Sequence, residues 1–60
     1  MTIAINGWKI LNAPNYATEY KYIVATPING ELWFYGAYND ADTVQNIIAN
    51  YPNKLMIVND

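Results

Sequence analysis

The sequence predicts an α+β fold, with one helix packed on one face of a small, mostly antiparallel sheet of four to five strands. Three observations support this class. Asn-Gly, the strongest short hairpin signal, occurs twice between strand-like runs, at residues 6–7 and 29–30. A single stretch has helical periodicity, and one short apolar run follows it. Because 60 residues approach the lower limit for an independent core, we expect one domain over residues 1–60.

The N-terminal segment has two interpretations that the sequence does not separate. Thr2 to Ile5 could fold back on Trp8 to Leu11 as a short hairpin around Asn6-Gly7. Alternatively, Gly7 could be a bulge in one longer strand. Residues 12–17 are predicted to form a loop, because Pro14 removes a ladder donor and asparagines favour turns.

A second hairpin is predicted from residues 19–26 and 31–38, which together hold six of the nine aromatic residues. A two-residue turn at Asn29-Gly30 would pair Ala25 with Phe34 and Val24 with Tyr35. One face of this hairpin would then carry Lys21, Ile23, Ala25, Leu32, Phe34 and Gly36. We expect the helix on that face, because Ala25 and Gly36 would let a helix approach closely.

The helix is predicted from Asp40 to about Tyr51, with Asn39 or Asp40 as the N-cap and Pro52-Asn53 ending it. Residues 54–58 then form a short apolar strand. The crossover has about the minimum length, so this strand should run parallel to the strand of residues 31–37. It could lie beside that strand or beyond the N-terminal one, and the sequence leaves its place open.

The opposite face of the hairpin carries a row of large side chains and is the predicted interface: Tyr20, Tyr22, Val24, Trp33 and Tyr35. Four half-exposed rings would form an apolar patch of ~400 Å², the size at which a monomer's surface starts to imply an interaction. Our first interpretation is a homodimer seam. The second is a platform on which a nucleotide or single-stranded nucleic acid stacks. The third is that the rings are ordinary strand formers.

Composition excludes several functions. The chain has no cysteine, histidine, serine or arginine, so we expect no enzyme, no zinc site and no cofactor. Helix capping explains Asp40 and Asp42 better than a metal pair. Three lysines and a net charge of −2 argue against binding to duplex DNA. The N-terminal residues do not form a basic leader and no 18-residue apolar run occurs, so we expect a cytoplasmic protein without membrane contact.

In size and build the chain resembles the very short proteins that phages encode against bacterial defence systems, including small homodimeric inhibitors directed against Hachiman defence. The resemblance rests on the Tyr20-Lys21-Tyr22 and Trp33-Phe34-Tyr35-Gly36 strand pair in a compact, cysteine-free, mildly acidic chain. It covers architecture only and transfers no individual site residue. It implies a homodimer in the host cytoplasm that inhibits a host protein target, unidentified here, by stoichiometric binding.

Overall fold

The computed structural model describes residues 1–59 and confirms the α+β class. A five-stranded sheet has the order β1-β2-β4-β3-β5, and all neighbouring pairs are antiparallel except β2 and β4. The elements along the chain are β1 (Ile3–Ile5), β2 (Trp8–Leu11), the 3₁₀ helix η1 (Asn15–Glu19), β3 (Tyr22–Ile28), β4 (Glu31–Tyr38), α1 (Ala41–Asn50) and β5 (Met56–Ile57). No helix within residues 1–59 is long and apolar enough to cross a membrane.

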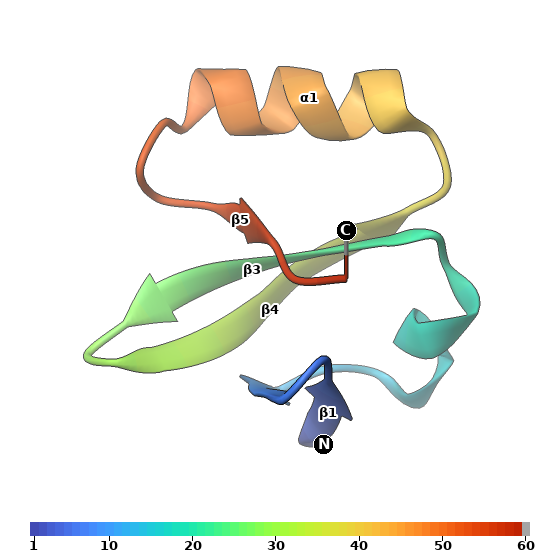
Figure 1. The fold of residues 1–60 in the computed structure, drawn as a ribbon, viewed down its shortest axis with the longest axis vertical. Coiled ribbons are helices and arrows are strands. Elements are labelled where there is room, and N and C mark those ends of the chain that lie inside the picture. Colours follow the sequence, from blue (N-terminus) through green and yellow to red (C-terminus); the bar gives the residue numbers. More distant parts are fainter. Residues whose placement is uncertain (60) are drawn as a thin grey trace.

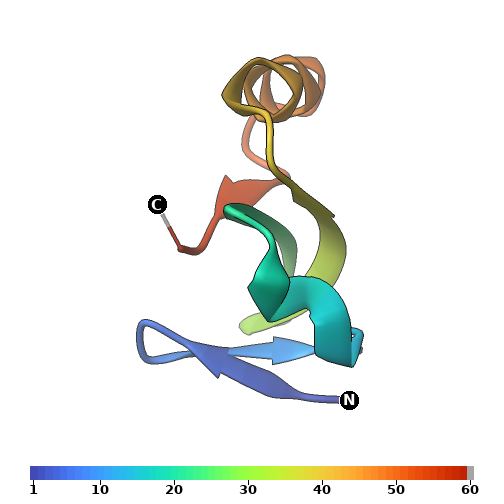
Figure 2. The same ribbon diagram turned by 90° about the vertical axis from the view of Figure 1, so that its right-hand side faces the viewer.

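Three levels stack on one another. Figure 2 shows α1 at the top, the β3–β4 hairpin with β5 in the middle, and the β1–β2 hairpin at the bottom. Figure 1 shows the β3–β4 hairpin running obliquely away from α1, so the turn between its strands lies far from the helix. The middle level is therefore enclosed between α1 and the N-terminal segment along only part of its length.

Both Asn-Gly pairs form two-residue turns. The backbone φ is +50° at Asn6 and +85° at Gly7, and +51° at Asn29 and +81° at Gly30. Positive φ at both central residues defines the type I′ turn, whose twist matches that of the flanking strands. The turn at residues 29–30 is confirmed, and the alternative at residues 6–7 is resolved as a hairpin. Because β2 and β4 are parallel and each begins just after its turn, the two turns lie at the same end of the sheet.

The pairing of β3 with β4 follows the predicted register near the turn and departs from it further along. Ala25 pairs with Phe34 as expected, but Val24 pairs with Gly36 and not with Tyr35. A β-bulge lies between these pairs, so Tyr35 is the extra residue on β4. One inserted residue reverses the facing of every later side chain. Gly36 therefore shares a face with Val24, whereas Gly36 was predicted on the opposite one.

The prediction that α1 packs on the Ile23 and Ala25 face is wrong. Val24 on β3 and Val44 on α1 are both 0% exposed, and neither belongs to the core cluster on the other face. The rings of Tyr35 and Tyr51, at the end of α1, are also neighbours, with centroids 6.4 Å apart. The helix therefore covers the Val24 face.

The Ile23 face is covered by the N-terminal segment. Its buried core cluster consists of Ile10, Ala13, Ala17, Ile23, Ala25, Leu32 and Val58, with no residue from α1. Small side chains at positions 13 and 17 let the segment lie close against β3. The core is thus aliphatic, and it is built from residues distant in the sequence.

The helix boundaries agree with the prediction. Asp40 is the N-cap of α1, and its carboxylate accepts hydrogen bonds from the Asp42 backbone N–H at 3.4 Å and from the Thr43 hydroxyl at 2.8 Å. These bonds satisfy donors that the first helical turn leaves free. At the other end, Tyr51 is the C-cap just before Pro52.

The last strand lies at neither of the two places considered for it. β5 pairs antiparallel with the outer edge of β3, so it runs in the same direction as β4 but is separated from it by β3. Beyond β5, the Asn59 side chain extends this pairing. Its Oδ1 accepts from the Ile23 N–H at 2.7 Å, and its Nδ2 donates to the Lys21 carbonyl at 2.8 Å. This double hydrogen bond holds the C-terminal segment on β3.

Candidate functional site

None of the nine aromatic side chains is fully buried. The buried positions are occupied by alanine, isoleucine, leucine and valine alone, while every ring is at least partly exposed. The prediction that the hairpin carries more rings than a small core can hide is confirmed. Aromatic surface of this extent is characteristic of interfaces.

The five predicted interface residues do not form one row. Tyr20 ends η1 and lies outside β3, with its ring 6.1 Å from the ring of Tyr16. Tyr22 begins β3 and is half-buried. Val24 is fully buried on the face that α1 covers, so its inclusion in the interface is corrected. Trp33 and Tyr35 alone remain exposed.

Two further exposed apolar side chains nevertheless lie near these two rings, on the same side of the sheet as α1. Trp33 is 36% exposed and Tyr35 is 46% exposed, and Ile28 (48%) and Tyr51 (49%) adjoin them. Ile28 lies diagonally across from Trp33 on the paired strand, and Tyr51 contacts Tyr35 from the end of α1. We call these four residues the helix-side patch. Tyr51 was missed because helical periodicity assigned it to the buried face of the helix.

Tyr38 bounds the helix-side patch at the end of the hairpin that lies away from the β3–β4 turn. The Tyr38 ring lies over Gly36, where an added Cβ would overlap it. Burial raises the pKa of the Tyr38 phenol, and the neighbouring Tyr35 raises it further. Tyr38 is therefore a structural ring, and the exposed part of the surface runs from Tyr35 toward the β3–β4 turn.

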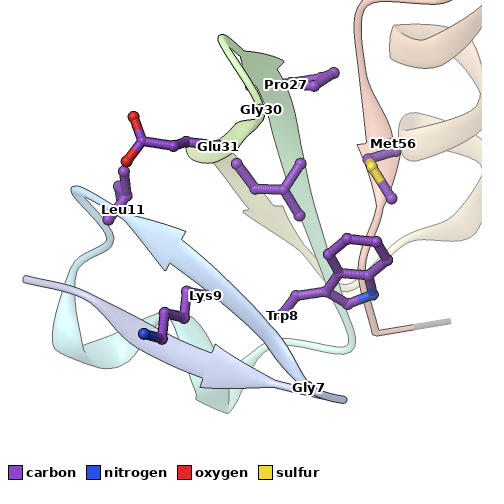
Figure 3. A pocket seen from close by; sticks show the side chains of 9 residues that line it. Gly7, Trp8, Lys9, Leu11, Pro27, Gly30, Glu31 and Met56 are labelled. Carbon is purple, nitrogen blue, oxygen red and sulfur yellow. The ribbon is translucent and has the colours of Figure 1, made fainter.

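The other face of the hairpin carries a hollow of about 480 Å³ between the two Asn-Gly turns. Its apolar lining comes from four strands: Trp8, Leu11, Pro27, Leu32 and Met56. We call these five residues the hairpin cup. Figure 3 shows Trp8 and Met56 on one side of the opening, and Leu11 beside Glu31 on the other. Gly7, Lys9, Gly30 and Glu31 complete the margin.

The hairpin cup was not predicted, because it depends on the parallel pairing of β2 with β4. That pairing spans only Ile10 with Leu32 and Leu11 with Trp33. Beyond these pairs the two strands separate toward their turns, and the cup lies in the fork. The repeated Ile-Asn-Gly triplet, at residues 5–7 and 28–30, is the one sequence feature shared by its two walls.

Two properties of the charged groups were determined for the described residues. Within residues 1–59, no three acidic side chains lie close enough together to hold a metal ion. The Thr43 hydroxyl bond lowers the pKa of Asp40, which has a capping role. No family model matches the chain, and no curated protein or solved structure matches it. Function is therefore argued from the helix-side patch and the hairpin cup.

Proposed function

We propose that the chain is a non-catalytic protein-interaction module that associates through the helix-side patch. The observation that carries this proposal is the partition of side chains between core and surface. Aliphatic residues fill the core, and four bulky apolar side chains stay exposed, three on the β3–β4 hairpin and one, Tyr51, at the end of α1. Neither the core nor the fold requires these large side chains on the surface. Contact with another molecule explains why they are exposed.

The first partner we propose is a second copy. With rings that can each bury ~150–250 Å² when fully covered, four side chains at just under half exposure offer roughly 350 Å² of apolar surface. A standard stable interface buries about 800 Å² per partner. The patch can form the centre of a two-fold interface, but the whole seam needs polar margins as well. The proposed homodimer is therefore weak, with dissociation in the micromolar range.

The second partner is a target protein in the bacterial host cytoplasm. The resemblance to small phage-encoded inhibitors supports a defence protein as the target, blocked by stoichiometric binding. The chain's chemistry is consistent with this role, since seven large hydrophobic side chains are exposed among the described residues. Nucleotide stacking on the aromatic face has less support, because α1 occupies much of that face and only Trp33 and Tyr35 are left for bases.

Sedimentation velocity over a range of protein concentrations tests the homodimer. We expect wild-type protein to shift from monomer to dimer in the micromolar range, and Trp33→Ala to raise the dissociation constant at least tenfold. The matched control is Tyr16→Ala, which removes an even more exposed ring outside the helix-side patch. A monomer at high micromolar concentration, or an equal effect of both substitutions, would contradict the proposed seam.

A further inference from the structure

We propose that the hairpin cup is a second binding surface, which takes uncharged, bulky apolar side chains from a short segment of a partner protein. This inference rests on the proposed function as an interaction module, and it assigns the contact to a different face of the molecule. Side chains from β2, β3, β4 and β5 converge in the cup.

The open shape of the cup favours a protein segment over a free small molecule. A cavity of ~150 Å³ holds a benzene-sized group, so about 480 Å³ has room for roughly three such groups. Its floor is closed by Leu32, which is 8% exposed, but Trp8 at its wall is 47% exposed. Small ligands usually bury most of their surface in enclosed pockets. A protein segment fills an open cup with side chains and covers the mouth with its own backbone.

The chemistry of the lining selects neutral apolar groups. The Trp8 indole offers a large flat contact surface, and the Met56 thioether adapts to the shape of its neighbour. The margin carries one cation, Lys9, and one anion, Glu31, so it has no net charge. Recognition of a phosphate requires several clustered donors or cations. A nucleotide therefore lacks its counterpart here, whereas leucine or phenylalanine side chains have one.

The position of the cup separates it from the proposed dimer seam. Pro27 and Leu32 pair on the Ala25 face of the hairpin, and Thr26 and Trp33 pair on the opposite face. A two-fold interface uses the same patch on both copies. A seam on the helix-side patch consequently leaves the Pro27 and Leu32 wall of the cup free on each protomer, while Leu11, the register partner of Trp33, lies at the border between the two surfaces. A dimer would present two cups, which suits bivalent binding to a partner.

Nuclear magnetic resonance with side-chain mimics tests the inference on the intact chain. The probes are N-acetyl-phenylalaninamide and N-acetyl-leucinamide, with N-acetyl-lysinamide and adenosine monophosphate as charged controls. We expect the two apolar probes to shift the Trp8 indole N–H and the Met56 methyl signals saturably, with millimolar affinity. The Trp33 indole N–H, on the other face, should not move, and the charged controls should bind at least tenfold more weakly.

Two substitutions locate the binding. Trp8→Lys should weaken the apolar probes at least tenfold, whereas Tyr16→Lys, at an exposed ring outside the cup, should leave their affinity unchanged. If Trp8→Lys does not fold, Pro27→Lys at the exposed margin of the cup serves the same purpose. Absence of saturable shifts up to about 50 mM probe, or equal binding of adenosine monophosphate, would overturn the inference.

The remaining occupants are distinguished in the same experiments. Shifts of the Met56 methyl signal with protein concentration, abolished by Trp8→Lys, would mean that a second copy fills the cup and would overturn the inference. An apolar molecule retained in native mass spectrometry would overturn it in favour of a small ligand. The two proposals can fail separately. If the wild-type chain forms no dimer but still binds the apolar probes, the proposed seam fails and the cup is supported. Trp33→Ala should remove the dimer and leave probe binding unchanged.

Discussion

Replacing Val44 by alanine tests the central structural correction, that α1 packs on the Val24 face of the sheet. Val44 is fully buried, and we infer that Val24 is its main contact on the sheet. Removing the two methyl groups loses ~1.6 kcal/mol of transfer free energy, and the residual cavity adds about 1 kcal/mol. The free energy of unfolding should therefore fall by about 2.5 kcal/mol. A 60-residue domain has roughly 3–9 kcal/mol in total, so the loss is a large fraction of it.

Urea denaturation of a double-mutant cycle measures the contact itself. With a slope of about 1 kcal/mol per molar urea for a domain of this size, the midpoint for Val44→Ala should fall by about 2.5 M. Val24→Ala combined with Val44→Ala should be non-additive by at least ~0.5 kcal/mol, because the two side chains share one cavity. Unfolding should be followed at two protein concentrations, so that any contribution from self-association is separated.

The control pair is Ile23→Val with Val44→Ala, since Ile23 lies in the core cluster on the opposite face. These two changes should add within ~0.3–0.5 kcal/mol. Coupling of Val44 to Ile23, with none to Val24, would refute the assignment of the helix face. A loss below ~0.5 kcal/mol for Val44→Ala alone would refute the packing of α1 on the sheet.

Three further outcomes follow from local contacts. Asn59→Ala should lower the free energy of unfolding by about 2 kcal/mol and speed hydrogen exchange at the Ile23 amide, since both hydrogen bonds to β3 are lost; a change below ~0.5 kcal/mol would argue against this clamp. Gly36→Ala should destabilise by roughly 1–3 kcal/mol because its Cβ overlaps the Tyr38 ring, and adding Tyr38→Ala should relieve part of the loss. The pKa of Asp40 is lowered, so the stabilisation that its carboxylate contributes is present above the usual value of 3.8 and is lost as pH falls through the folded pKa. Asp40→Asn caps the helix without titrating. The melting temperature of the wild-type protein should therefore fall relative to that of Asp40→Asn as pH is lowered across that range.

The elements predicted correctly are those determined by short-range chemistry. Asn29-Gly30 forms its turn because asparagine and glycine tolerate positive φ, and Asp40 begins the helix because its carboxylate bonds to the next turn. Neither depends on a distant part of the chain. The same is true of the helix end before Pro52, where the ring of proline prevents continuation.

The wrong predictions arise where one inserted residue reverses the facing of all later side chains in a strand. Alternation along β4 predicted the facing of each side chain, and the bulge at Tyr35 invalidated it from Gly36 onward. Gly36 is a signal of a bulge, because a glycine inside a strand often marks one, but it was interpreted only as room for a helix. The covering of the Ile23 face by Ala13 and Ala17 is equally non-local, because it depends on how the N-terminal segment folds back. Of the predicted interface residues, Trp33 and Tyr35 are therefore exposed, whereas Val24 is buried on the face that α1 covers.

The exposed surfaces can be traced to a mismatch in length between the helix and the hairpin. A ten-residue α1 spans ~15 Å, whereas the eight residues of β4 span ~26 Å. The helix starts near the inner end of β4 and cannot reach the turn, so Ile28 and Trp33 stay uncovered on its side. On the other face β2 pairs with β4 over only two residues before the strands separate. Successive side chains along a strand point to opposite faces. Near the β3–β4 turn, an aromatic surface is therefore exposed on one face and the Pro27 wall of the cup on the other. A short helix and a short parallel pairing thus leave two distinct apolar surfaces on opposite faces of one hairpin, so a second copy on one face leaves the other open to a different partner.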